Sequence, residues 1–209
     1  MPKVVDPVAR REQVVDALFR IAIREGLQQA SLRNVADEAG LNIGSVRHYF
    51  ATHQELMIFA MRSMVGRVSG RLLRHVDAAP DLRACSREER RKVVAALLEE
   101  LLPLDDARRA EVTVFVEFAA AARTTPALGA PAREAAAGTR ALITRVLTRL
   151  DEAGDVRPGL DLATETVRLW ALLDGLSLDA VLHPELMSGA DCVAALRAHL
   201  DALGPAAAG

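Results

Sequence analysis

Residue types that define several common protein classes are scarce in this sequence. Among 209 residues there are two cysteines, one tryptophan and one tyrosine, and aromatic residues make up 3% of the chain. Cys85 and Cys192 do not show the spacing of metal ligands. Two unpaired cysteines are typical of a reducing compartment, so a cytoplasmic protein without a disulfide is predicted.

Long apolar runs and a strong net charge are missing as well. No segment reaches the roughly 18 apolar residues of a membrane span. The N-terminal stretch MPKVVDPVARRE lacks the apolar run of a signal peptide. We therefore expect no membrane partner. The formal net charge is −2, so any binding to nucleic acid must depend on a local surface and not on the average charge.

Sequence motifs that carry enzyme chemistry are also missing. The chain has no phosphate-binding glycine-rich loop, no nucleophile elbow and no Ser/His/Asp arrangement. A di-metal helical bundle needs Glu-x-x-His pairs, and none of the five histidines has a glutamate three residues before it. The sequence predicts no enzyme, and it predicts neither a cofactor nor a bound metal.

Amphipathic patterns rich in Ala, Leu, Val and Arg are what the chain does contain, and 51% of its residues are hydrophobic. This composition favours an all-α fold. Apolar periodicity, capping residues and breakers mark where each helix begins and ends. They predict helices at about 7–25, 32–38, 43–49, 53–76, 87–102, 107–123, 131–153, 160–183 and 190–203.

The segment VTVFVEF, residues 112–118, fits either a helix or a strand, because β-branched residues favour strands. No second strand-like segment exists to pair with it, and a lone buried strand would leave its amides without partners. We therefore predict a helix there. The stretch HVDAAPDLRAC, residues 75–85, is predicted to be a loop, because Pro80 cannot continue a helix.

Residues 31–50, SLRNVADEAGLNIGSVRHYF, contain two short helical segments on either side of a turn with Gly40. Two helices joined by so short a turn form a helix-turn-helix unit. With Val35, Val46 and Phe50 buried, the polar residues of the second helix remain at the surface, where such a helix can enter the major groove. These polar residues are Ser45, Arg47, His48 and Tyr49.

Arg47 is the best candidate for a base contact, because a guanidinium matches the O6 and N7 acceptors of guanine. His48 and Tyr49 can donate to bases or phosphates, and Ser31, at a helix N-terminus, can hold a phosphate. Each residue alone has an ordinary explanation as a surface or half-buried side chain. The prediction depends on their joint occurrence behind an amphipathic first helix. Further DNA-binding candidates in the same module are Arg33, Asn42 and Gly44.

The same module resembles the signature of the TetR-type transcriptional regulators. The resemblance is carried by SLRNVADEAG at residues 31–40 and GSVRHYF at residues 44–50. Two positions depart from the family pattern. Arg47 occupies a position where the family usually has Tyr, and His53 occupies a position where a Lys often binds a phosphate. A neutral imidazole lacks the positive charge of a lysine, which weakens the contact to the DNA backbone or makes it dependent on pH.

The resemblance implies two domains, a three-helix DNA-binding domain at 1–52 and a helical bundle for effector binding and dimerisation at 53–209. The segments FVEFAAAARTTPAL and LWALLDGLSLDAVLHPE also resemble the BetI-type second domain. Such a protein is expected to bind a palindromic operator in double-stranded DNA as a homodimer. It is usually a repressor that a small-molecule effector releases. The alternative is a helical protein–protein interaction module that uses the helix-turn-helix only as a scaffold.

An effector pocket is expected among the middle helices, where large flexible or aromatic side chains gather. Plain core packing explains each of these side chains at least as well. Glu117 and Arg123 lie beside the same apolar runs and could orient a polar ligand group, or lie on the surface. The candidate pocket residues are Met57, Met61, Met64, Phe115, Phe118 and Trp170.

The predicted helix at 160–183 is apolar most of the way round, so more than one of its faces must be covered. One stripe repeats at spacings of 4, 3, 4, 3 and 4 residues, as in a helix-packing seam. We predict that the last two helices pair with those of a second copy, the alternative being a monomer in which this helix is central. The expected interface residues are Leu162, Leu169, Leu173, Leu176, Val193, Leu196 and Leu200.

Overall fold

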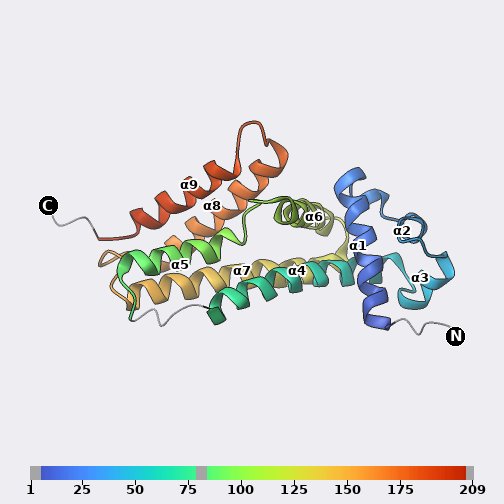
Figure 1. Cartoon of the computed structure of the whole chain (residues 1–209), viewed down its shortest axis with the longest axis horizontal. Helices are drawn as coiled ribbons and strands as arrows, with labels where there is room; N and C mark the ends of the chain where they lie inside the picture. The colour runs from blue at the N-terminus through green and yellow to red at the C-terminus, as the bar shows by residue number, and fades with distance from the viewer. Residues whose placement is uncertain (1–5, 79–83, 206–209) are drawn as a thin grey trace. The chain divides into compact units, whose positions relative to one another are not determined.

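The computed structural model describes residues 6–78 and 84–205, and its secondary structure in these ranges is helical (Figure 1). The all-α prediction is therefore confirmed. None of the described helices combines the length and the hydropathy that crossing a bilayer requires. The elements are α1 (Pro7–Glu25), η1 (Leu27–Gln29), α2 (Leu32–Glu38), α3 (Ile43–Tyr49), α4 (His53–Ala78), α5 (Arg87–Glu99), α6 (Asp106–Ala122), α7 (Pro126–Glu152), α8 (Leu162–Leu182) and α9 (Gly189–Ala202).

Most predicted helix ends agree with these bounds to within a few residues. The ambiguous segment 112–118 lies inside α6, as predicted. The predicted loop at 75–85 begins later than expected, because α4 continues to Ala78. Pro80, on which that loop prediction rests, lies outside the described residues.

The start of α7 differs from the prediction. The helix begins at Pro126, and Pro131 lies inside it. A proline in the first turn of a helix removes an N–H that would have no partner there. Pro131 removes one interior hydrogen bond, and its ring is buried, so apolar contacts offset part of that cost. A start at Pro131 was therefore the wrong prediction.

Side-chain caps fix where several helices begin. At α5, Ser86 and Glu89 form a capping box. At α4, the Thr52 hydroxyl accepts the Glu55 N–H at 3.1 Å. The Glu55 carboxylate reaches back to the Ala51 N–H at 2.9 Å, one residue earlier than a capping box requires. These hydrogen bonds fix the start of α4 immediately after the helix-turn-helix in the sequence.

The chain divides into two compact units, each with its own apolar core. Unit 1 comprises Met1–Arg67 and Thr113–Arg133, and unit 2 comprises Val68–Val112 and Glu134–Gly209. The core of unit 1 includes Leu18, Met61 and Phe118, and that of unit 2 includes Leu98, Leu147 and Leu169. The helices α4, α6 and α7 each contribute residues to both units. The predicted functional boundary after residue 52 stays a prediction.

Candidate nucleic-acid interface

The turn between α2 and α3 is short and closed by backbone hydrogen bonds. Gly40 has φ +66°, a left-handed conformation that side chains disfavour. The Leu41 N–H donates to the Ala36 carbonyl at 2.9 Å. From α1, the Gln13 side-chain amide donates to the Ala39 carbonyl at 3.0 Å. The turn is thus held against α1 by a residue that the sequence did not single out, since a lone exposed glutamine carries no signal.

The inner side of the helix-turn-helix is apolar, as predicted. Val35 and Val46 are fully buried, and Phe50 is 3% exposed. The Phe50 ring lies 5.3 Å from the ring of Phe59 on α4. The Arg11 guanidinium lies over both rings, 5.9 Å and 5.7 Å from their centroids, in cation–π geometry. The end of α3 is therefore fixed from two sides.

The outer side of α3 carries the polar tip that the sequence predicts. Arg47 and His48 are exposed, while Ser45 and Tyr49 are half-buried. The edge of the Tyr49 ring meets the His48 ring, with centroids 5.1 Å apart. Within the described residues, Arg47 has no hydrogen bond or ion pair, so its guanidinium is available to an external acceptor. The other exposed candidates are Ser31, Arg33, Asn42, Gly44 and His53.

Two of these candidates act as helix caps. The Ser31 hydroxyl accepts the Asn34 N–H at 3.2 Å, and the side-chain oxygen Oδ1 of Asn42 accepts the Ser45 N–H at 2.7 Å. Capping uses only acceptor capacity. The Ser31 O–H and the Asn42 side-chain NH₂ keep their hydrogens for donation. Both helices therefore begin with side chains that can still donate to a phosphate.

His53, the first residue of α4, makes a contact that the sequence did not predict. Its Nε2 lies 2.9 Å from the Ala30 carbonyl, just before α2. When Nε2 carries the proton, it donates to this carbonyl and joins the start of α4 to the start of α2. In the neutral ring the Nδ1 atom is then an acceptor, and an acceptor does not bind a phosphate oxygen.

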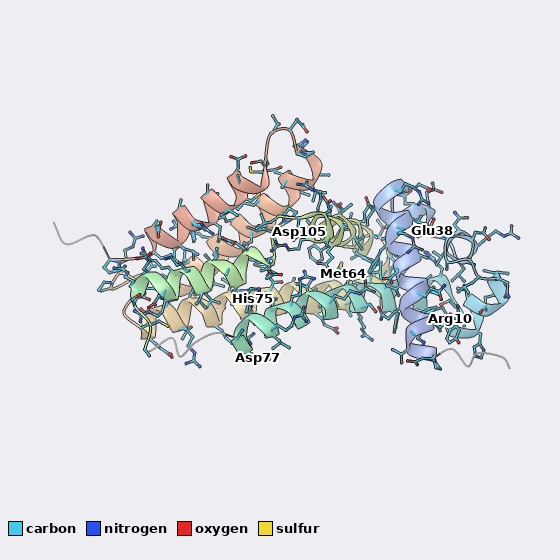
Figure 2. The ribbon with its side chains drawn as sticks, in the orientation of Figure 1. Arg10, Glu38, Met64, His75, Asp77 and Asp105 are labelled. Atoms are coloured by element: carbon cyan, nitrogen blue, oxygen red, sulfur yellow. The ribbon has the colours of Figure 1, made fainter. Side chains whose placement is uncertain are left out.

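Cations on the C-terminal half of α1 are neutralised within the chain. Figure 2 shows Glu38 beside α1, toward the other end of that helix from Arg10. The Glu38 carboxylate accepts hydrogen bonds from Arg20 at 2.7 Å and from Arg24 at 2.9 Å. These bonds lower the pKa of Glu38. Arg33 and Arg47, in contrast, form no ion pair with described residues and keep a full unpaired charge.

The predicted effector-pocket residues fall into two groups. Five of them belong to the core of unit 1 or pack against it, and Trp170 packs against the core of unit 2. Phe115 is half-buried. Glu117 precedes the core residue Phe118 on α6. Its carboxylate accepts the N–H of Leu27, the first residue of η1, at 3.2 Å. The four side chains that are at most 6% exposed are Met57, Met61, Met64 and Phe118.

The predicted dimer seam needs a correction. A side chain covered by its own protomer has no surface left for a partner, and this applies to most of the seam. Leu162 and Val193 are half-buried. The large apolar residues of α8 that stay exposed lie elsewhere on the helix, at Val167, Leu178 and Leu182. The seam residues at most 6% exposed in the core of unit 2 are Leu169, Leu173, Leu176, Leu196 and Leu200.

Residues 90–205 match the family model described as "BetI-type transcriptional repressor, C-terminal". The HTH-type transcriptional regulator PksA of Bacillus subtilis is 34% identical over 184 residues, which are 88% of this chain and 84% of PksA. A solved transcriptional regulator from Rhodococcus sp. Rha1 is 33% identical, with a TM-score of 0.77 over 92% of this chain and 95% of that chain. A structure from Saccharomonospora viridis in complex with choline, 20% identical, shares the fold with a TM-score of 0.78 over 93% of this chain and 95% of that chain.

The capped turn, the buried inner side and the free polar tip together define a helix-turn-helix DNA-binding protein. The chain belongs to the TetR family of transcriptional regulators, with a BetI-type C-terminal domain. It is accordingly a DNA-binding regulator and not an enzyme. Membership of this family also decides against the alternative of a protein–protein module without DNA binding.

Proposed function

We propose that this regulator is a repressor that binds a palindromic operator as a homodimer and leaves it when a small-molecule effector binds. The observation that carries the proposal is the exposed Arg47 at the end of α3, which has no partner among the described residues. A free guanidinium can donate two N–H groups to O6 and N7 of one guanine. His48 and Tyr49, next to it, supply further donors for bases or phosphates.

Contacts to the DNA backbone are proposed at the two helix starts. The Ser31 hydroxyl and the Asn42 amide keep donors free, and the exposed Arg33 adds a cation on α2. Such contacts fix the orientation of the recognition helix and carry little sequence information. Gly44, Ser45 and His53 complete the proposed interface. His53 can donate to a phosphate only when both of its ring nitrogens carry protons, because Nε2 already contacts the Ala30 carbonyl.

A homodimer is proposed through the exposed apolar face of α8. Val167, Leu178 and Leu182 are 48%, 40% and 54% exposed in one protomer. A large exposed apolar surface indicates a binding site for another protein. Two recognition helices about 34–36 Å apart would then read two half-sites one turn of DNA apart. This surface replaces the buried leucines that the sequence pattern suggested.

For the effector we propose the methionine-rich core of unit 1 as the site, with Met57, Met61 and Met64 on α4 beside Phe115 and Phe118 on α6. Thioether side chains repack easily around an apolar guest. Because α4 also starts at the helix-turn-helix, a ligand that changes its position would change DNA binding. The ligand can do so only by its differential affinity for the two states. Trp170, in unit 2, is not part of this proposed site.

The experiment that tests the proposed function is selection of bound duplexes from a random DNA pool by the purified full-length chain. An enriched inverted repeat with half-sites about 10 base pairs apart supports the operator and the dimer together. Enrichment of one unrepeated half-site refutes the dimeric operator. The absence of any enriched sequence refutes specific DNA reading by α3.

A further inference from the structure

One face of α8 is not covered by the described part of its own chain. The helix runs beside α9 in unit 2 (Figure 1). Its side away from the buried Leu169, Leu173 and Leu176 carries the exposed Val167 and Leu178. Ala171 and Gly175, between them, are also exposed. Apart from the chain neighbours of Gly175 and the nearby backbone of α8 itself, no described atom lies within 4 Å of the position that a Cβ would take there. We call this surface, from Val167 to Leu182, the α8 face.

Two opposite charges lie on the α8 face without a full set of partners. Asp174 has no hydrogen bond or ion pair with any described residue. Partial burial raises the pKa of its carboxyl. Arg168 is 65% exposed at its side chain and uses one nitrogen, which donates to Glu165 at 2.8 Å. A guanidinium has five N–H donors, so most of those of Arg168 are free.

Ala171 lies midway between these two charges, three residues from each. Three residues correspond to a rise of about 4.5 Å along the helix. At 100° per residue, Arg168 and Asp174 lie on opposite flanks of the line that runs through Ala171. The face therefore has a small residue at its centre, a cation on one side and an anion on the other.

A two-fold dimer can pair this face with itself in few ways. Parallel helices would bring Asp174 against its own copy. Antiparallel helices that cross at Gly175 would also bring the two copies of Asp174 close together, because Asp174 is next to the crossing point. Both arrangements place two poorly hydrated carboxylates together, which is costly. Antiparallel helices that cross at Ala171 instead bring Asp174 level with the partner's Arg168.

We propose that two copies of α8 cross antiparallel at Ala171 and that Arg168 of each protomer pairs with the partner's Asp174. The proposal rests on the proposed homodimer and assigns its register. Ala171 allows a close approach of the helices, and Gly175 leaves space for the incoming guanidinium. Two identical ion pairs form around the axis, bordered by the apolar side chains of Val167 and Leu178.

Such pairs mainly determine which surfaces recognise each other. A wrong register or a related regulator with a different charge pattern would leave Asp174 without a cation, or against another carboxylate. Repulsive alternatives of this kind are what makes an interface specific. The apolar residues of the α8 face then supply most of the affinity, and the ion pairs select the partner.

The test uses two charge reversals in the full-length chain, Asp174→Arg and Arg168→Asp. Each reversal places like charges together twice in its own homodimer, and a dissociation constant at least tenfold higher than that of the parent is expected. In a mixture, the arginine introduced at position 174 of one variant meets the aspartate introduced at position 168 of the other. The Arg168 and Asp174 side chains that each variant retains meet as well. Native mass spectrometry of the mixture should therefore show heterodimers well above the statistical half.

The matched control is the pair Asp151→Arg and Arg145→Asp, which has the same six-residue spacing on α7 and exposed side chains. These variants should dimerise like the parent and mix statistically. Statistical mixing of the α8 variants would overturn the register while leaving the homodimer intact. A monomeric parent chain would instead refute the proposed homodimer. A folding defect does not mimic the expected result, because mixing two misfolded chains restores no dimer.

Discussion

Arg67 and Arg71 lie one turn apart on α4 and bind carboxylates of different helices. Arg67 donates to Glu12 at 2.6 Å and to Asp16 at 2.7 Å, both on α1. Arg71 donates to both oxygens of Glu111 on α6, at 2.8 Å and 2.5 Å. The first pair of contacts lies in unit 1 and the second in unit 2. α4 is thus held on both sides of the point where it passes from one unit to the other.

The contacts of Arg71 belong to a small network of charges. Arg71 also donates to Glu100 at 3.0 Å, and Glu100 lies 3.1 Å from the Nε2 atom of His75. Figure 2 shows His75 on α4. Arg108 on α6 donates to the same carboxylate at 3.3 Å. This network connects α4 to the end of α5 and to α6.

Replacement of Arg71 by Gln is expected to lower the free energy of unfolding by about 1 to 3 kcal/mol, because the partly buried Glu111 loses its cation and Glu100 keeps only Arg108. Arg71 is 23% exposed, so solvent screens the interaction only in part. The control is Arg74→Gln on the next turn, which is exposed and should change stability by less than about 0.5 kcal/mol. Equal effects in urea denaturation would show that the network stabilises nothing.

Replacement of His53 by Lys should tighten DNA binding and steepen its salt dependence. A lysine brings a full charge to the start of α4, and each added phosphate contact changes the slope of log K against log salt by about 0.9. Fluorescence anisotropy with a selected duplex at several salt concentrations measures both quantities. His183→Lys, exposed at the end of α8, adds the same charge far along the chain. The same slope in both variants would mean that residue 53 does not face a phosphate.

His199 should make stability depend on pH. Burial lowers the pKa of His199, and the nearby Glu165 carboxylate, 4.0 Å away, opposes this shift only in part. The unfolded chain therefore binds the proton more readily. The free energy of unfolding should fall as the pH drops from about 6.5 toward the lower pKa of the folded state.

The change that isolates this effect is His199→Gln, which removes the titrating ring. Urea denaturation at about pH 7.5 and about pH 5.5 should show a smaller loss for the variant than for the parent, by up to about 1.4 kcal/mol per pH unit. The same loss in both proteins would show that other groups cause the pH dependence.

Substitutions at Leu173 and at Leu178 should affect different properties, folding in the first case and dimerisation in the second. Leu173 is 2% exposed and Leu178 is 40% exposed. Leu173→Glu buries an unpaired charge and should unfold unit 2. Leu178→Glu should leave the melting temperature of the protomer nearly unchanged and should lower the dimer fraction in analytical ultracentrifugation. A folded, dimeric Leu178→Glu variant would contradict the proposed interface on the α8 face.

The sequence predicted the elements of this fold well because local chemistry determines where they begin and end. Ser31 and Asn42 cap their helices through neighbouring amides, and Gly40 takes the left-handed turn, all within a few residues along the chain. The predicted helix start at Pro131 was wrong, because a long helix tolerates the loss of one backbone hydrogen bond at an interior proline whose ring is buried.

The faces of α8 could not be assigned from the sequence for a different reason. Leu169 and Leu178 look alike in an apolar pattern, and only the packing of α5, α7 and α9 decides which of them is covered. Long-range side-chain contacts were equally unpredictable. The pairing of Gln13 with the Ala39 carbonyl and of Arg71 with Glu111 joins residues 26 and 40 positions apart. The sequence pattern shows that such polar residues lie at the surface, but it does not indicate which distant residue each of them contacts.

In the proposed complex, Arg47 reads a guanine in each half of a symmetric site. The most direct measurement is guanine-N7 methylation interference on a selected duplex, with the parent chain and with Arg47→Ala. For the parent, we expect interference at one guanine in each half-site, about 10 base pairs apart. In Arg47→Ala that interference should vanish at both positions, with a loss of about 1 to 3 kcal/mol of specific binding. Unchanged interference at both guanines in the variant would show that Arg47 does not contact them.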